Sequence, residues 1–552
     1  MSKIRLLFFF FIICFFLILA KLVYLQVIAR DLFSADYIAT QKISPVRGKI
    51  FDRHLQPLAV NQSSYLLYVE PPKIQDKSYL ARKLDEVLKI GEATIEARIN
   101  DKKQWAAIKD GLTDEQKAAL EKEKLKGIGF QNQQIRFYPE ASLAAHLVGF
   151  VGKNDTGSSV GYFGIEGYYD KDLAGLAGVI KSERDLIGRP IFVGTQDFVA
   201  AEDGRDLVLT IDKTVQHIIK DALRRGMDLY KPKQGCVIVT YPATAEILGL
   251  TCLPDYDPDT YYDYSEKTFN DWAISDLYEP GSTFKPLVMA AALEEKKVKP
   301  SDLFDEKGGV EISGYTIQNW NDKYEGKISI SRILEKSSNV GMVYVGNKLG
   351  NERLYQYLGK YGLGGSTEID LQGEAVSYLK PIKDWYPIDF SAAAFGQGIA
   401  MTPLQLIRAF GAVVNGGYLM KPYTVKAIID GGEEKQRDPK PVRRVISEQT
   451  SATMRQMLVS TVEHAEAKWD RPEGYKIGGK TGTAQLAIGG NYDASKTIAS
   501  FVGFAPADNP VFLVLVVLRE PATSGWGSET AAPIFFEIAK QLFVYYNIPP
   551  QE

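Results

Sequence analysis

The chain begins with an apolar segment that a water-soluble domain could not leave exposed. Residues Leu6–Ala20, LLFFFFIICFFLILA, carry no charge, and LVYLQVIA follows after Lys21. About 20 apolar residues cross the hydrocarbon core of a membrane, and a lysine at its edge can extend to the headgroups. A cleavable signal peptide is the alternative, but its apolar region is usually shorter and ends in a small-x-small site, which we do not find after Leu19. We therefore expect residues 1–25 to form a short tail and an uncleaved transmembrane anchor, with 4–25 in the membrane.

The remaining sequence has the composition of a globular protein. The 552 residues are 45% hydrophobic and 24% charged, with a formal net charge of −3. This length exceeds one hydrophobic core, so two or more domains are expected, and the charge gives no basic footprint for nucleic acid. No later segment is apolar enough to span a membrane, so a single-pass protein is predicted. Lys3 and Arg5 before the apolar run nearly balance Lys21 and Arg30 after it, so charge alone leaves the orientation open.

A change of sequence pattern near residue 205 predicts a domain boundary. Before it, RGKIFDRHLQPLAVNQSSYLLYVEP alternates apolar and polar residues as strands do, and DEQKAALEKEKLK has helical spacing. After it, GRDLVLTIDKTVQHIIKDALRRGMDLY predicts a strand, a helix cap at Asp212 and a long amphipathic helix. Strands and apolar helices then alternate in an α+β manner. We predict a mixed N-terminal domain over 26–205 and an α+β domain over 206–552.

Cys236 and Cys252 flank the segment VIVTYPATAEILGLT, whereas the third cysteine, Cys14, lies in the apolar run. The segment predicts two strands joined by a Pro-Ala-Thr turn. A turn centred near Thr244 would place the two sulfurs opposite each other, and a cross-strand disulfide could form. A slip of one residue would separate them, so two buried free thiols are the alternative. No Cys/His spacing indicates zinc.

The segment GSTFKPLVMAAALEE places a serine and a lysine at the start of an apolar helix. Pro286 fits only in the first turn, and positions three apart share a face, so Ser282 and Lys285 meet at the helix N-terminus. The helix dipole favours negative charge there, which allows Lys285 to act as a base and Ser282 as a nucleophile. A capping serine beside a solvated lysine is the alternative. Ser377 and Lys380 repeat the spacing without an apolar helix behind them, and we reject that copy.

A second pattern, LEKSSNVGMV, places Ser337 and Asn339 two residues apart. Their side chains face one way if the stretch is a tight turn between helices. A hydroxyl can relay a proton, and an amide can hold a peptide carbonyl. The alternative is a pair of helix caps.

A third pattern, YKIGGKTGTAQLA, predicts a strand rich in small residues. Lys480 supplies positive charge, and Thr481 and Thr483 supply hydroxyls that suit a carboxylate. Gly482 would let a ligand backbone come close. An edge strand protected by a lysine is the alternative.

Two other motif matches lack the context that their chemistry needs. GYKIGGKT, Gly474–Thr481, fits the P-loop spacing, but polar sequence precedes it and a strand, not a helix, is predicted after it. GSSVG, around Ser159, fits a nucleophile elbow but lies in a predicted loop. We predict neither nucleotide hydrolysis nor a hydrolase triad.

The three patterns resemble the ordered motifs of penicillin-binding proteins and β-lactamases, Ser282-x-x-Lys285, Ser337-x-Asn339 and Lys480-Thr481-Gly482. RGKIFDRHLQPLAVN, GIEGYYDKDLAG, AFGQGIAMTPLQL and FVGFAPADNP look like further signatures of class B penicillin-binding proteins, so the resemblance covers nearly the whole chain. EPGSTFKP, KSSNVGM and WYPIDFSAAAFGQG look most like the septal, FtsI-type branch, with the elongation-type branch as the close alternative. His54-Leu55-Gln56 departs from the family's small polar turn, which puts one hairpin in doubt.

The resemblance implies a fold and a reaction. The fold is an elongated pedestal domain followed by a transpeptidase domain, an antiparallel sheet with helices on both sides. The reaction is the cross-linking of peptidoglycan at D-Ala-D-Ala stem peptides by a serine-type transpeptidase that β-lactams inhibit, without cofactor or metal. The implied catalytic residues are Ser282, Lys285, Ser337 and Asn339, and the implied substrate-binding residues are Lys480, Thr481, Gly482 and Thr483.

The resemblance also implies a setting. The anchor would lie in the cytoplasmic membrane with the catalytic domain outside, and the pedestal would contact a membrane-embedded glycan polymerase of the FtsW type and other division proteins. A D,D-carboxypeptidase or β-lactamase would lack the N-terminal module, and a penicillin sensor would generally carry several spans. A catalytically idle division component is the further alternative, which the intact motifs argue against.

Overall fold

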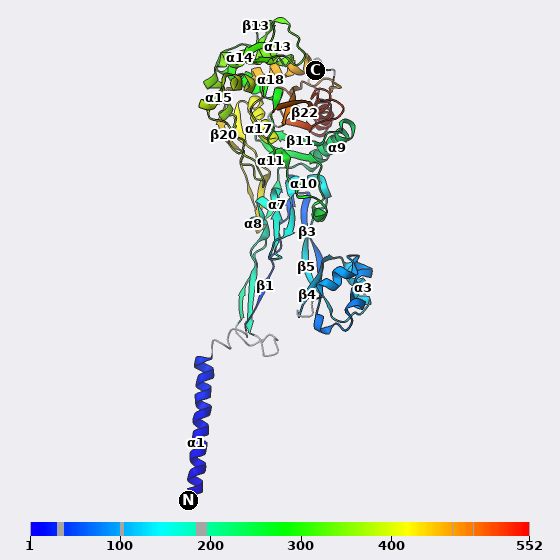
Figure 1. Ribbon diagram of the computed structural model, residues 1–552, viewed down its shortest axis with the longest axis vertical. Helices are drawn as coiled ribbons and strands as arrows, with labels where there is room; N and C mark the ends of the chain where they lie inside the picture. The colour runs from blue at the N-terminus through cyan, green and yellow to red at the C-terminus, as the bar shows by residue number, and fades with distance from the viewer. Residues whose placement is uncertain are drawn as a thin grey trace. The chain divides into compact units, whose positions relative to one another are not determined.

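The computed structural model describes residues 2–29, 38–99, 104–183, 196–465, 467, 469–488 and 491–550 (Figure 1). Contacts between residues divide the chain into two compact units. The first unit combines Met1–Gly48 with Lys171–Arg205, and the second combines Lys49–Asp170 with Asp206–Glu552.

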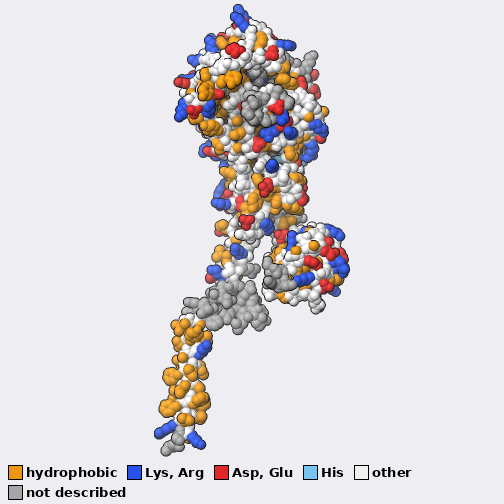
Figure 2. Space-filling view, in the orientation of Figure 1, with side chains coloured by type: hydrophobic (Ala, Val, Ile, Leu, Met, Phe, Trp, Pro, Cys, Tyr) orange, Lys and Arg blue, Asp and Glu red, His pale blue; other side chains and the backbone are white. Residues whose placement is uncertain are grey.

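The first unit contains the apolar helix α1 (Ser2–Val23), which continues as one π-helical stretch, η1 (Tyr24–Ile28). Figure 2 shows hydrophobic side chains covering this helix. Lys3–Ile28 is long and apolar enough to cross a membrane, and no second such helix occurs among the residues that the structure describes. The same unit holds an antiparallel sheet of three strands, β1 (Ile38–Ile43), β8 (Gly178–Glu183) and β9 (Gln196–Val199).

A seven-stranded mixed sheet in the second unit joins segments from both sides of residue 205. Its strands are β2 (Ile50–Phe51), β3 (Pro57–Val69), β4 (Ala106–Leu112), β5 (Ile128–Phe137), β10 (Asp206–Leu209), β18 (Val425–Asp430) and β19 (Glu433–Gln436). The central contact is parallel, with Leu207 opposite Ile50. Helices α3 (Lys77–Leu88), α4 (Glu92–Arg98) and α5 (Asp114–Lys122) supply apolar residues to a core beside β3 and β4. The boundary near 205 stays a prediction.

The hairpin between β2 and β3 forms despite the unusual His54-Leu55-Gln56 sequence. Leu55 takes a left-handed backbone, φ 61°, where a glycine would be free of strain. Asp52 compensates, because its buried carboxylate accepts the backbone N–H groups of His54 and Gln56, both at 2.8 Å.

A five-stranded antiparallel sheet organises the C-terminal part of the second unit, in the order β12-β11-β23-β22-β21. Its strands are β11 (Gln234–Tyr241), β12 (Glu246–Leu253), β21 (Gly478–Ile488), β22 (Asn491–Ala505) and β23 (Phe512–Arg519). Helices α9 (Lys213–Tyr230) and α19 (Ala531–Tyr545) pack on one face, and α12 (Lys285–Glu294), α17 (Pro403–Val414) and α18 (Glu448–Glu463) lie on the other side (Figure 1). The predicted α+β architecture is confirmed. Asp212 caps α9 as predicted, since its carboxylate accepts the N–H groups of Thr214 and Val215.

Shorter elements complete the second unit. They are β6 (Phe150–Lys153), β7 (Ser159–Tyr162), α6 (Ala145–Val148), α7 (Gly164–Tyr168), α10 (Glu266–Phe269), α11 (Trp272–Ser275), β13 (Leu303–Glu306), β14 (Val310–Ile312), β15 (Tyr315–Ile317), β16 (Gly326–Ser329), α13 (Ile330–Glu335), α14 (Asn339–Leu349), α15 (Asn351–Lys360), α16 (Pro387–Ala393), β17 (Tyr418–Lys421) and β20 (Lys440–Arg444). Helix α8 (Asp170–Ala174) spans the point where the chain passes from the second unit to the first.

The two candidate cysteines face each other across β11 and β12. Cys236 lies directly opposite Cys252 in the ladder, with a Cα–Cα distance of 4.2 Å, and the structure joins them in a disulfide. Of the two alternatives that the sequence left open, the structure has the cross-strand bridge. The turn lies at 242–245, close to the expected centre.

Candidate functional site

The predicted serine and lysine lie where a tight turn enters an apolar helix. A 3-10 turn, η5 (Gly281–Phe284), carries Ser282 and passes directly into α12, which begins at Lys285. Pro286 occupies the first turn of α12, as its missing N–H requires. Ser282 is partly exposed, whereas the Lys285 side chain is fully buried. The lysine is therefore not the solvated lysine of the alternative interpretation.

Ser337 lies in the short turn between α13 and α14. Its N–H donates to Leu334 O and the next N–H, of Ser338, donates to Ile333 O, which is the hydrogen-bond pattern that closes a helix C-terminus. Glycine usually fills this position, yet Ser337 adopts the left-handed backbone, φ 57°. The cap of α14 is Ser338, which accepts the N–H of Gly341. Ser337 and Asn339 are thus not the caps themselves, and their side chains are available for other contacts.

Those side chains meet Lys285. The lysine Nζ donates to Ser337 O at 2.6 Å, to Ser337 Oγ at 3.2 Å and to Asn339 Oδ1 at 2.8 Å. These three contacts fix the amino group of Lys285, which burial has removed from water. Among the described residues, no hydrogen bond joins Lys285 to the Ser282 hydroxyl. Hydrogen bonds to a nucleophile often tighten only when a substrate is bound. We call Ser282, Lys285, Ser337 and Asn339 the helical group.

Residues Lys480–Thr483, the strand group, lie on the edge strand β21 beside β22. Lys480 Nζ donates to the Thr481 hydroxyl at 3.2 Å, and Thr483 Oγ1 accepts the N–H of Gly527 at 3.1 Å. Both threonines are partly exposed. The structure adds a packing reason for the glycine, because a Cβ on Gly482 would lie 2.8 Å from Thr283 Cγ2 and would also meet Ser500 Oγ. Its missing side chain lets the turn of Ser282 pack against the strand.

The two groups are electrostatically coupled. Burial, reinforced by the positive charge of Lys480, holds the pKa of Lys285 well below its usual range. Burial also lowers the pKa of Lys480 to about 7. A lysine with a strongly depressed pKa can be neutral at physiological pH and can then accept a proton. The arrangement therefore provides a buried base three residues after a partly exposed hydroxyl.

The motif matches that we rejected on sequence grounds lack the structural surroundings of a catalytic site. Ser377 is buried and its hydroxyl accepts from Gly364 N and Gln405 Nε2, while Lys380 pairs with Asp389 at 3.1 Å. Ser159 is the first residue of β7, whereas a nucleophile elbow places its serine at the turn between a strand and a helix. The P-loop match runs into β21, a strand, where a helix would be needed.

One further group of residues has the donor types and closeness of a metal site. Cys236, Cys252 and Asp271 are the only such grouping among the described residues. The two sulfurs are joined in the disulfide, so this grouping offers no pair of thiolates to a metal.

The structure adds residues that the motifs did not indicate. Gly396, in AFGQG, accepts the N–H of Gly281 at 3.0 Å, and a Cβ on Gly396 would collide with Gly281 O. Glu306 and Asn319 lie behind the turn of Ser337 and Asn339. The AFGQG run was visible in the sequence without a role, whereas Glu306 and Asn319 lie in no recognisable pattern.

Comparison with known proteins identifies the family. Residues 42–209 match the penicillin-binding protein dimerisation domain, and residues 235–540 match the penicillin-binding protein transpeptidase domain. Stage V sporulation protein D of Bacillus subtilis is 35% identical over 98% of this chain and 85% of its own length. A peptidoglycan D,D-transpeptidase FtsI homolog of Mesostigma viride is 31% identical over 97% of this chain and 94% of its own.

Solved structures agree with this assignment. A peptidoglycan synthetase from Bifidobacterium adolescentis, 28% identical, has a TM-score of 0.75 and covers 93% of this chain and 98% of its own. Penicillin-binding protein 3 of Mycobacterium tuberculosis in complex with aztreonam, 25% identical, has a TM-score of 0.69, with 93% and 99% coverage. The fold and the two matched domains thus define a penicillin-binding transpeptidase. The chain belongs to the class B penicillin-binding proteins.

Proposed function

We propose that this protein cross-links peptidoglycan through a serine acyl-enzyme in which Ser282 is the nucleophile and Lys285 its base. The observation that carries the proposal is the state of Lys285, which is fully buried, has a depressed pKa and is fixed by Ser337 and Asn339. A neutral amine at this position takes the hydroxyl proton as Ser282 attacks the carbonyl of the penultimate D-alanine. General-base assistance of this kind contributes about 10²–10⁴-fold to the rate.

Ser337 and Asn339 have separate roles in the proposed reaction. The Ser337 hydroxyl, 3.2 Å from Lys285 Nζ, passes the proton towards the nitrogen of the departing D-alanine. Asn339 holds Lys285 through Oδ1 and offers its amide group to the substrate backbone. The amine of a second stem peptide then attacks the acyl-enzyme, so that the ester to Ser282 breaks and a new peptide bond forms.

The strand group binds the end of the donor peptide. Lys480, Thr481 and Thr483 carry the charge and hydroxyls that suit the terminal carboxylate, and Gly482 brings the strand against the turn of Ser282. A bound carboxylate would favour the charged form of Lys480, whose pKa burial lowers to about 7. The backbone N–H groups of Ser282 and Thr483 form the oxyanion hole, and the loss of one such donor typically costs about 10²–10³ in rate. β-Lactams acylate Ser282 in the same way.

We further propose a place in the cell. The helix at Lys3–Ile28 anchors the protein in the cytoplasmic membrane by a single pass, and the catalytic domain lies on the outer side. FtsI homologs among the relatives, together with the KSSNVGM and EPGSTFKP segments, support a role in cell division beside an FtsW-type glycan polymerase. The elongation-type role is the alternative. A fluorescent fusion at mid-cell in dividing cells is the expected result, and uniform side-wall signal would favour the alternative.

Release of D-alanine from a stem pentapeptide tests the reaction directly. The full-length protein in detergent should release D-alanine and, with an acceptor amine, form a cross-linked dimer. Ser282→Ala should do neither, whereas Ser377→Ala, which changes the rejected serine, should match the wild type. Release by Ser282→Ala at the wild-type rate would refute the assignment of the nucleophile.

A further inference from the structure

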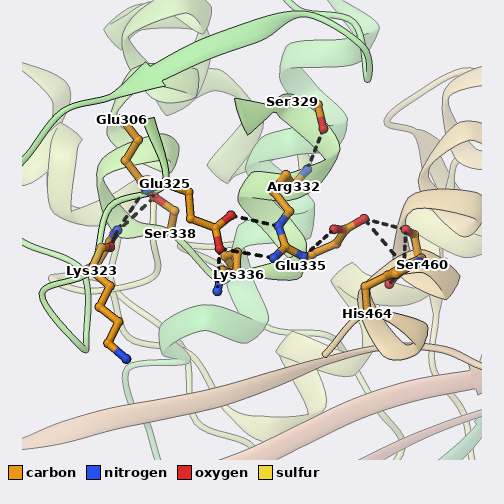
Figure 3. Close-up of polar contacts among 11 residues, drawn as sticks. Glu306, Lys323, Glu325, Ser329, Arg332, Glu335, Lys336, Ser338, Ser460 and His464 are labelled. Atoms are coloured by element: carbon orange, nitrogen blue, oxygen red, sulfur yellow. Dashed lines mark hydrogen bonds and ion pairs between the residues drawn. The ribbon is translucent and has the colours of Figure 1, made fainter. Parts of the chain in front are cut away.

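A buried carboxylate lies behind the turn of Ser337 and Asn339, and the proposed chemistry does not use it. Glu306, at the end of β13, is 3% exposed. Its carboxylate accepts the Ser338 hydroxyl at 2.5 Å, Asn319 Nδ2 at 2.9 Å and the N–H of Glu325 at 3.1 Å. Figure 3 shows Glu306 and Ser338 directed towards each other. A carboxylate taken from water is retained only where such donors compensate it, so these contacts fix the local structure.

Asn319 transmits this fixation to the helical group. Its Oδ1 accepts the backbone N–H of Asn339 at 3.0 Å and that of Val340 at 3.4 Å. N–H groups at the start of a helix such as α14 have no acceptor within the helix itself. The preceding carbonyl, Gln318 O, accepts Asn339 Nδ2 at 2.9 Å. One N–H of the Asn339 side chain is therefore held on the side of Gln318, and this leaves Oδ1 directed at Lys285.

The same segment reaches the strand group through an aromatic pair. Trp320 contacts Trp526 edge-to-face, with ring centroids 5.0 Å apart, although the two residues remain 52% and 41% exposed. The residue after Trp526 is Gly527, whose N–H donates to Thr483 Oγ1 at 3.1 Å. Three consecutive residues, Gln318–Trp320, thus contact Asn339 on one side and Trp526 on the other, and Trp526 precedes the residue that binds Thr483.

Ion pairs tie the segment that follows to α13, the helix that ends before Ser337. Glu325 pairs with Arg332 at 3.1 Å and with Lys336 at 2.7 Å (Figure 3). Arg332 also pairs with Glu335 at 3.1 Å. The backbone N–H of Glu325 also donates to the Glu306 carboxylate, so Glu325 contacts both Glu306 and α13.

We propose that Gln318–Trp320, anchored by Glu306, is a positioning segment that sets the helical group and the strand group at the separation that acylation requires. Glu306 and Asn319 act through Asn339 and Lys285 and do not touch the substrate. The inference rests on the proposed role of Ser282 and adds four positioning residues to it, Glu306, Asn319, Trp320 and Trp526. Misplacement of a reacting group by about 1 Å can cost on the order of 100-fold in rate.

An exchange of the acid and amide groups tests the contact between Glu306 and Asn319. Asn319→Asp places a carboxylate against Glu306, and the acylation rate by a fluorescent penicillin should fall about 10- to 100-fold, with little change in the dissociation constant of the noncovalent complex. Glu306→Gln restores a donor, so the double variant Glu306→Gln/Asn319→Asp should acylate several-fold faster than Asn319→Asp. Asn321→Asp, the same substitution at a nearby, partly exposed site, is the matched control. A double variant no faster than Asn319→Asp, at equal thermal stability, would overturn the proposal.

A double-mutant cycle tests the aromatic contact. Trp320→Ala and Trp526→Ala should each slow acylation about 3- to 10-fold, and the double variant should be little slower than either one, since both remove the same contact. Trp105→Ala, which removes a partly exposed ring paired with Tyr68, is the control and should have no effect. Independent, multiplying effects of the two tryptophans would contradict the proposed link. Two negative outcomes are distinguishable. If the wild-type protein is not acylated at all, the proposed function fails. If all variants are acylated as fast as the wild type, only the positioning segment is refuted.

Discussion

The helical group and the strand group are held in place by different forces. Lys285 is fixed by the hydrogen bonds that its Nζ donates to Ser337 O and Asn339 Oδ1. Asn319 and Glu306 support this turn from behind. The strand group depends instead on the backbone ladder between β21 and β22 and on the missing side chain of Gly482. The first group should therefore be sensitive to the loss of single polar atoms, and the second to added volume.

The largest effect is expected from the loss of a polar atom in the helical group. Lys285→Met should reduce the acylation rate by about 10²–10⁴-fold, because the base is lost while an apolar side chain still fills the buried site. Stopped-flow acylation by a fluorescent penicillin gives the rate. Lys380→Met, in the rejected copy of the motif, should acylate like the wild type. Unchanged acylation of Lys285→Met would show that Lys285 is not the general base.

Added volume should affect the strand group almost as strongly. A Cβ in Gly482→Ala would meet Thr283 Cγ2 at 2.8 Å, so the turn of Ser282 must move away from the strand. We expect acylation to fall on the order of 100-fold and the free energy of unfolding to fall by about 1–3 kcal/mol. Denaturant unfolding and acylation measure both. Gly365→Ala, where no atom lies within 4 Å of the new Cβ, is the control. Wild-type acylation by Gly482→Ala would show that the close packing is not required.

The disulfide should affect stability without affecting the chemistry of either group. Removal of a cross-link between residues 16 apart, by Cys236→Ser/Cys252→Ser, should lower the free energy of unfolding by about 3 kcal/mol. Acylation of the folded protein should stay within about twofold of wild type, since both cysteines lie outside the two groups. Mass spectrometry of native protein under alkylating conditions should find Cys14 as the only reactive thiol. Alkylation of all three cysteines without reductant would exclude the bridge.

The smallest expected effect is a shift in pH dependence. The charge of Lys480 helps to lower the pKa of Lys285, so Lys480→Met should raise that pKa and move the acid limb of the acylation profile to higher pH. Burial makes the folded-state pKa of Lys480, about 7, lower than its unfolded value of 10.5. Burying the charged amine therefore opposes folding at neutral pH, and this cost decreases as the pH rises from about 7 to 10.5. Lys480→Met removes the cost and should raise the melting temperature at pH 7.

Lys435→Met, at an exposed lysine of β19, controls for the loss of a positive charge elsewhere. An acid limb that moves to lower pH in Lys480→Met, or no movement at all, would contradict the coupling of the two lysines.

The motifs were readable in the sequence because each one is local. Ser282 and Lys285 share a helix turn, Ser337 and Asn339 flank one residue, and Lys480–Thr483 form one strand. Periodicity and proline placement were sufficient to predict these elements. The apolar N-terminal helix and the cap at Asp212 were predictable for the same reason.

The supporting residues were not predictable because they act across long stretches of chain. Glu306 lies 32 residues before Ser338 and Asn319 lies 20 before Asn339, and a single acid or amide carries no pattern. The packing of Gly482 against Thr283 and Ser500 was not predictable either, because both residues are distant in the sequence. Its predicted role beside a ligand backbone stays a prediction. The parallel contact between β2 and β10, 157 residues apart at Ile50 and Leu207, is likewise invisible to local spacing.

The most direct test of the central claim is to locate the acyl group. Full-length protein would be acylated with penicillin, digested and sequenced by mass spectrometry, beside Ser282→Ala. We predict the adduct on Ser282 alone in the wild type and no adduct in the variant. An adduct on another serine, or undiminished acylation of Ser282→Ala, would contradict this prediction.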